Sequence, residues 1–173
     1  RKEVIDKMSF VMKEAYGNPS STHSYGRKSK SYLENARKSI ASILNAEPKE
    51  IIFTSGGTES DNMIIQRAVL DLNIKTIISS PIEHHAVIHA IENLDNIKYN
   101  NVLLTKDGSI DLEHLEKLLI ENNDLKLVSL MHVNNEIGNI LDLKKVGELC
   151  KNNNAYFHTD AVQGIGHFEI DLK

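Results

Sequence analysis

Short apolar runs alternate along the chain with longer segments in which apolar residues recur every three or four positions. The short runs are rich in β-branched residues and predict strands, whereas the longer segments have the period of amphipathic helices. The predicted strands cover residues 50–54, 76–80, 97–102, 127–133 and 155–161. The predicted helices cover residues 26–44, 58–72, 84–94, 112–121 and 143–153.

This alternation predicts an α/β fold, in which a mainly parallel sheet is flanked by helices on both faces. The helix over residues 26–44 precedes the first strand, and its apolar positions predict a packing role. In open α/β sheets, ligands bind at the carboxyl ends of the strands. The polar residues that follow each predicted strand are therefore the candidates for chemistry.

Composition narrows the class of protein. The chain has 173 residues, 40% of them hydrophobic and 25% charged, with a net charge of −4, which is typical of a globular sequence with one sizeable core. No Lys/Arg cluster is present, so direct binding of nucleic acid is not expected. A metal site is not predicted either. The apolar runs are too short to span a bilayer, and without a secretory signal pattern we expect a cytoplasmic protein.

The single cysteine, Cys150, excludes an internal disulfide and is predicted to be a buried structural thiol.

An Asp-x-x-Gln pattern stands at the carboxyl end of the last predicted strand, with Asp160 in the strand and Gln163 just after it. A carboxylate in this place can pair with a protonated ring nitrogen, the contact by which enzymes strengthen pyridoxal phosphate (PLP) as an electron sink. The alternative is a surface carboxylate beside a loop. The pattern gains weight from two further polar segments, at residues 53–62 and 83–87, which follow other strands.

The first of these segments contains Ser55-Gly56-Gly57-Thr58, between a predicted strand and a predicted helix. Free backbone N–H groups at a helix start attract anions, the glycines allow close approach, and the Thr58 hydroxyl adds a donor. The segment is thus a phosphate cradle in outline. The alternative is a tight turn in which Thr58 caps the helix.

His84 follows the next strand, and Asn134 and Asn135 follow the one after that. An imidazole at this edge can stack on a flat ring and relay protons, although a histidine at a strand-to-helix junction also serves as a cap or surface group. Asn135 is predicted to reach the same pocket as Asp160, whereas the alternative for an Asn pair is a turn. We predict that Thr58, His84, Asn135, Asp160 and Gln163 converge on one edge of the sheet.

Together these segments resemble cysteine desulfurases of the PLP-dependent class V aminotransferase superfamily. The matching segments occur in the family's order over nearly the whole chain: residues 17–23 (Gly-Asn-Pro-Ser-Ser-Thr-His), 53–62, 83–87, 131–138 and 157–163. The Asn-Pro-Ser-Ser form resembles the branch that supplies sulfur for iron-sulfur clusters and tRNA thiolation. The resemblance implies the front half of a fold-type-I large domain at residues 17–173, preceded by an arm or small-domain helix at residues 1–16.

The resemblance also implies roles for individual residues. Gly57 and Thr58 would bind the PLP phosphate, and His84, the implied catalytic residue, would stack on the ring. Asp160 would pair with the ring nitrogen and Gln163 with the phenolic oxygen, with Asn135 beside that oxygen and the substrate carboxylate. His23 lies in a matching motif, but no role is assigned to it. The implied substrate is L-cysteine, with sulfur passing through an enzyme persulfide to an iron-sulfur scaffold or a tRNA-thiolation enzyme, and the implied assembly is a homodimer.

The chain also departs from the family pattern. The family's Ser-x-His-Lys motif, whose lysine forms the Schiff base, is expected beyond Lys173, and its persulfide cysteine later still. Lys173 is not preceded by histidine, and Cys150 matches a helix position, so neither inherits these roles. We therefore expect this chain to be inactive alone. Two other interpretations stay open: another class V enzyme, such as an aminotransferase or a hydrolase similar to kynureninase, and a non-catalytic binding or scaffold module.

Overall fold

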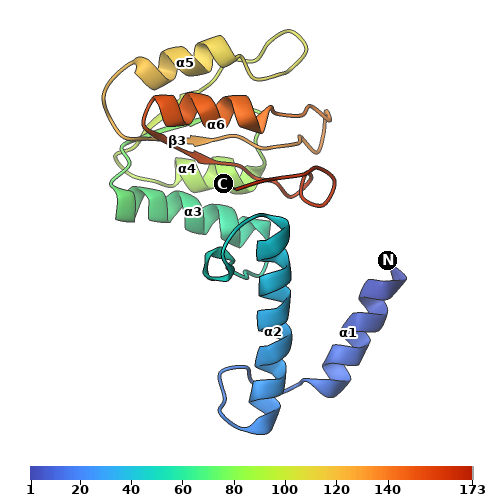
Figure 1. Ribbon diagram of the computed structural model, residues 1–173. Helices are drawn as coiled ribbons and strands as arrows, with labels where there is room; N and C mark the ends of the chain where they lie inside the picture. Colours follow the sequence, from blue (N-terminus) through green and yellow to red (C-terminus); the bar gives the residue numbers. More distant parts are fainter. Residues whose placement is uncertain (173) are drawn as a thin grey trace. The chain divides into compact units, whose positions relative to one another are not determined.

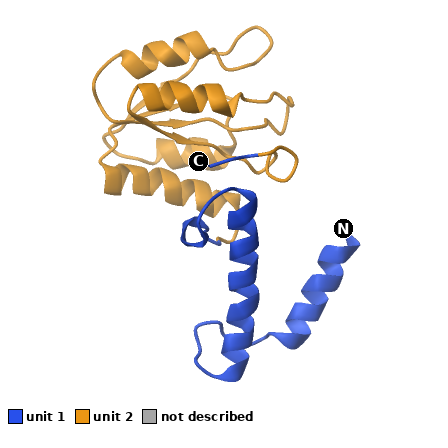
Figure 2. Cartoon of the chain, in the orientation of Figure 1, with its two compact units in different colours: residues 1–53, 170–173 blue, residues 54–169 orange. Residues whose placement is uncertain are grey.

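The computed structural model describes residues 1–172, which fall into two compact units (Figure 2). The first unit comprises residues 1–53 and the segment that begins at Ile170, and the second comprises residues 54–169. The predicted division into an arm at residues 1–16 and a domain from residue 17 stays a prediction. No described helix has the length and apolar character that a membrane span requires.

The second unit contains a four-stranded sheet in which all neighbouring strands are parallel (Figure 1). The strands are β1 (Thr76–Ser79), β2 (Lys98–Asn101), β3 (Lys126–Ser129) and β4 (Ala155–His158), in the order β2-β1-β3-β4. The helices that connect or precede them are α3 (Gly57–Leu72), α4 (His85–Glu92), α5 (Leu112–Ile120) and α6 (Leu143–Asn152). The structure thus confirms the predicted α/β class and the parallel sheet.

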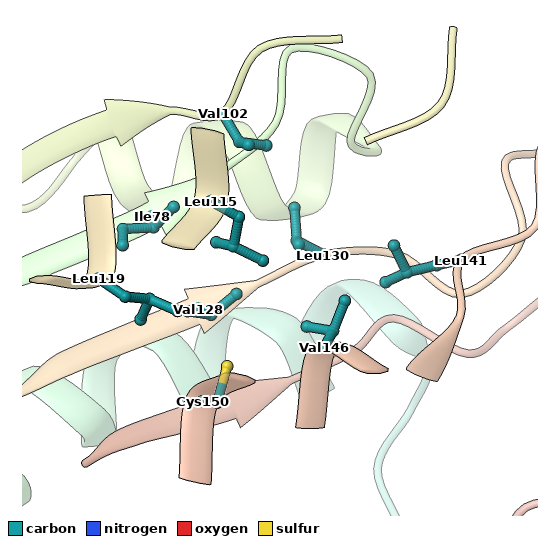
Figure 3. Close-up of a cluster of buried hydrophobic side chains, with 9 residues drawn as sticks. All are labelled: Ile78, Val102, Leu115, Leu119, Val128, Leu130, Leu141, Val146 and Cys150. Carbon is teal, nitrogen blue, oxygen red and sulfur yellow. The ribbon is translucent and has the colours of Figure 1, made fainter. Parts of the chain in front are cut away.

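The strand side chains alternate between two hydrophobic clusters, one on each face of the sheet. Ile77 and Leu127, paired in register, pack with α3 and α4, whereas Ile78 and Val128 pack with α5 and α6. Figure 3 shows the second cluster, which includes Cys150. Burial on both faces explains why these strands read as continuous apolar runs. Cys150 is 1% exposed, and burial raises the pKa of its thiol to about 12, so the prediction of a buried structural thiol is confirmed.

The first unit is built from α1 (Lys2–Glu14), α2 (Ser24–Ile43) and a 3₁₀ turn, η1 (Pro48–Glu50). The Ser29 hydroxyl donates to the Ala15 carbonyl at 2.9 Å. His23 is the N-cap of α2, where its Nδ1 accepts the Gly26 N–H at 3.3 Å. The structure therefore gives His23 a capping role at the start of α2.

The strand predicted over residues 50–54 is wrong. Glu50 belongs to the 3₁₀ turn, and residues 51–54 form no strand. The Ile51 carbonyl accepts a hydrogen bond from Arg37, whose guanidinium lies 4.9 Å from the Phe53 ring centroid. An apolar run becomes a strand only when a neighbouring strand pairs its backbone groups, and no described strand does so here. Ile52 is accordingly 66% exposed.

The strands predicted over residues 127–133 and 155–161 end early, at Ser129 and His158. Two single hydrogen bonds extend the pairing beyond these ends, from Leu130 N–H to the His158 carbonyl at 3.1 Å and from His132 N–H to the Asp160 carbonyl at 2.9 Å. The backbones then separate into loops. These loops carry the polar residues of the candidate site.

Candidate functional site

Three loops meet at the carboxyl ends of the parallel strands. The Asn134 amide donates to the Ile82 carbonyl at 2.8 Å, which joins the loop after β3 to the loop after β1. The His132 N–H bond to Asp160 joins the loops after β3 and β4. A Cβ atom added to Gly57 would lie 3.2 Å from Val162 Cγ2, so the start of α3 also approaches the loop after β4. The predicted convergence of these loops on one sheet edge is therefore found for the segments around Thr58, His84 and Asp160.

The first turn of α3 offers free N–H groups at this edge. Gly56 is the N-cap, and the first helical hydrogen bond runs from Ser60 N–H to the Gly56 carbonyl at 3.1 Å. The amides of residues 57–59 therefore lack helical partners. Thr58 is exposed and lies inside the helix, so the alternative in which Thr58 is the cap is wrong.

The loop before α3 is held by Glu59. Its Oε2 accepts both the backbone N–H and the hydroxyl of Ser55, each at 2.6 Å. These hydrogen bonds lower the pKa of Glu59. Because the Ser55 amide donates to Glu59, it is not available to an anion at this helix start. The amides of residues 57–59 are the ones that could bind the anion.

His84 caps α4, and its imidazole is exposed. Its Nδ1 accepts the Ala86 N–H at 3.1 Å, so the proton of the neutral ring is on Nε2. The predicted alternative, a capping histidine, is thus what the structure shows. Capping engages one ring nitrogen in the ring plane and leaves the ring face available for stacking.

Asp160 is partly buried, and its Oδ1 accepts the Val162 N–H at 2.9 Å. This bond orients the carboxylate and leaves Oδ2 available. Gln163 and Asn135 are both exposed. In the Asn pair, Asn134 is the residue that forms the turn, since its Oδ1 accepts the N–H groups of Glu136 and Ile137 at 2.8 and 2.9 Å.

Two buried carboxylates stand beside Asp160, and sequence reasoning assigned neither a role. Asp61 is 5% exposed, and burial, followed by the charge of Asp160, raises its pKa to about 6, against an opposing effect of His84. Burial likewise raises the pKa of Glu83 to about 7, although Ser80 donates to Glu83 Oε1 at 2.6 Å. The sequence does hold a signal for Asp61, because it shares a helical face with the buried Ile65.

His158 is the third polar residue that the sequence did not single out. Its Nδ1 lies 2.9 Å from the Ser129 hydroxyl, and its Nε2 lies 3.6 Å from Asp61 Oδ1. Burial lowers the pKa of His158, against the opposing charge of Asp160. Because burial lowers the pKa of His158 below its ordinary value, the imidazole is neutral near pH 7, and its contact with Asp61 is not an ion pair there.

The edge is electrostatically polarised. Besides burial, the charge of Asp160 helps to raise the pKa of both Asp61 and Glu83, and none of the three carboxylates pairs with a Lys or Arg in the part of the chain that the structure describes. A cationic group beside Asp160 would offset this charge, whereas the free amides of α3 suit an anion. PLP carries both, a protonated ring nitrogen and a phosphate, and the residues therefore fit it.

Comparison with known proteins agrees with this geometry. The sequence profile of the aminotransferase class-V family matches residues 1–173. Cysteine desulfurase IscS of Dictyoglomus turgidum is 43% identical over 99% of this chain, which spans 44% of that relative. A solved structure of a NifS-like protein has a TM-score of 0.93 at 36% identity, over 99% of this chain and 48% of its own. A structure described as SspA in complex with cysteine has a TM-score of 0.91 at 29% identity, over 99% and 50%.

We predict that Asp61→Asn stabilises the chain above pH 6. The pKa of Asp61 is about 6 in the folded protein against 3.8 as its ordinary value, so its protonated form favours folding below pH 4 and this contribution is lost as the pH rises through 6. Urea unfolding should show a gain of roughly 1 to 3 kcal/mol at pH 8 and almost none at pH 4. Asp71→Asn, an exposed change on the same helix, serves as the control. An equal gain at both pH values would contradict the assignment.

Proposed function

The chain belongs to the aminotransferase class-V family, and from this membership we propose that the full-length protein is a PLP-dependent cysteine desulfurase. Such an enzyme converts L-cysteine to L-alanine and transfers the sulfur to one of its own cysteines as a persulfide. The observation that carries the proposal is the approach of the α3 N-terminus to the loop of Asp160, since a Cβ atom added to Gly57 would lie only 3.2 Å from Val162 Cγ2. This spacing brings an anion site and a cation site within the span of one small cofactor.

Each end of PLP would meet one of these sites. Gly57 and Thr58 would hold the phosphate with backbone amides and the Thr58 hydroxyl, because a helix start attracts anions. Asp160 would keep a proton on the ring nitrogen by a charge-assisted hydrogen bond from that nitrogen. When bound, PLP supplies an electron-poor ring that accepts an electron pair from the substrate.

The remaining predicted residues would orient the ring. The exposed imidazole of His84 would stack on it, and the hydrogen bond from Ala86 N–H to Nδ1 would hold the imidazole in one tautomer. Gln163 would donate to the phenolic oxygen, with Asn135 beside it. These two assignments stay predictions, and their support is the exposure of both side chains on loops that follow β3 and β4.

The attacking thiol and the cofactor lysine are expected elsewhere in the full-length protein, because this chain spans 44% of the relative's length. Cys150 is unsuited to carry a persulfide, since its thiol is buried and its pKa is raised to about 12. Lys173 lies outside the described residues, and we do not assign it to the cofactor. The names of the relatives support L-cysteine as substrate. An iron-sulfur scaffold or tRNA-thiolation enzyme as sulfur acceptor, a homodimer and a cytoplasmic location are further proposals.

We predict that Asp160→Ala in the full-length protein lowers alanine production more than PLP retention. The phosphate contacts would remain, but a charge-assisted hydrogen bond of roughly 1.5 to 3 kcal/mol would be lost at the ring nitrogen, which corresponds to about a 10- to 100-fold loss of turnover. Bound PLP and alanine release are measured on the same samples. Asp95→Ala, at an exposed aspartate outside the site, is the control. Unchanged turnover with PLP fully bound would show that Asp160 is structural.

We also predict that the 173-residue chain does not release sulfide from L-cysteine when it is supplied with PLP. Its one thiol is buried and held protonated, so it cannot attack the substrate sulfur. Sulfide is assayed over time against a sample with PLP and cysteine but no protein. Sustained release above that background would contradict the assignment of the nucleophile to another part of the full-length protein.

A further inference from the structure

A line of polar groups crosses the sheet beneath the proposed cofactor edge. The Ser79 hydroxyl donates to the Ser129 carbonyl at 2.8 Å, and the Ser129 hydroxyl lies 2.9 Å from His158 Nδ1. His158 Nε2 then lies 3.6 Å from Asp61 Oδ1. The line therefore runs from β1 through β3 and β4 to α3, on the face of the sheet that α3 and α4 cover.

One arrangement of protons suits the groups in this line when Asp61 is ionised. Its carboxylate can accept but not donate, so the tautomer with the proton on His158 Nε2 is favoured. At 3.6 Å the contact between Nε2 and Asp61 Oδ1 is electrostatic and longer than a hydrogen bond. His158 Nδ1 is then an acceptor, and the Ser129 hydroxyl donates a hydrogen bond to it. Asp61 accepts no hydrogen bond within the described residues, so the Nε2–H group is its one polar neighbour on β4.

The two ends of the contact lie next to the two halves of the proposed cofactor site. Asp61 is one helical turn after Gly57, whose amide belongs to the phosphate cradle. His158 precedes Asp160 by two residues on the same chain segment. A contact between Asp61 and His158 thus ties the first turns of α3 to the strand that presents the ring-pairing carboxylate.

We propose that Asp61 and His158 are positioning residues, whose contact fixes the distance between the α3 N-terminus and Asp160 and thereby sets the affinity for PLP. The proposal rests on the proposed function. It follows from rigidity: a site holds a ligand tightly when its separate parts are locked at the right spacing before the ligand arrives. A buried carboxylate in an otherwise apolar helix face costs stability, which argues against a purely stabilising role.

Two neutral substitutions of His158 in the full-length protein distinguish its Nε2 contact with Asp61 from its Nδ1 contact with Ser129. His158→Gln extends an amide N–H toward Asp61, whereas His158→Asn is shorter and reaches only Ser129. We expect His158→Asn to raise the Kd for PLP by up to about tenfold, the factor of roughly 1.4 kcal/mol of coupling between two polar groups in contact, and His158→Gln to raise it less than about threefold. Neither variant changes the charge of the site, so the difference reports the contact alone.

A double-mutant cycle tests whether the two residues act as a pair. In an Asp61→Ala background, His158→Asn should change the Kd by less than about twofold, because the contact is already absent. The cycle also cancels the effect of removing the Asp61 charge near the phosphate. Ser129→Ala is a second test that leaves Asp61 and His158 in place. It removes the hydrogen bond that holds the His158 ring in one tautomer, and it should raise the Kd for PLP about threefold.

Loss of stability is separated from loss of positioning by a control. Leu119→Ala on α5 opens a cavity on the opposite face of the sheet, and it should lower the urea midpoint of the apo-protein without changing the Kd. Equal Kd values for His158→Asn and Leu119→Ala, or full additivity in the cycle, would overturn the positioning role alone. Failure of the unmodified full-length protein to bind PLP would overturn both this inference and the proposed function.

Discussion

Parallel pairing of the strands is the constraint on which the rest of the structure depends. Because β1, β3 and β4 run in the same direction, their carboxyl ends share one edge, and the residues that follow them meet although they are far apart in sequence. The hydrogen bond from His132 to Asp160 and the one from Asn134 to Ile82 show this convergence directly. The apolar clusters on the two faces fix the sheet, so the site inherits its geometry from the core.

The second determinant is the cost of burying charge. A carboxylate with no cationic neighbour raises its pKa as it loses water, and Asp61 and Glu83 both show this effect. Both lie beside Asp160, at the edge where the first amides of α3 are free. The carboxylates thus gather around Asp160, whereas the free amides at the start of α3 supply positive potential. A cationic ring beside Asp160 and an anionic phosphate at these amides would suit this arrangement.

Sequence reasoning located much of this fold, and its failures have physical causes. Strands such as Thr76–Ser79 were predictable because both faces are buried and β-branched residues fill them. The strand at residues 50–54 failed because pairing depends on a partner that local sequence does not reveal. Asp160 and His84 were singled out because they follow strands, and their roles stay predictions. Asp61 and His158 lie inside elements, where a polar residue is visible as buried only once the neighbouring element is placed. Spacing alone does not determine which of Asn134 and Asn135 forms the turn, and the place of Asn135 in the pocket stays a prediction.

The central claim is that one edge of the sheet holds the phosphate of PLP at the start of α3 and its ring nitrogen at Asp160. A crystal structure of the full-length protein with PLP bound tests it most directly. The account predicts phosphate oxygens within hydrogen-bond distance of the Gly57 and Thr58 amides, and the ring nitrogen within hydrogen-bond distance of the Asp160 carboxylate. A bound PLP whose ring nitrogen faces another residue, or whose phosphate lies away from α3, would contradict it.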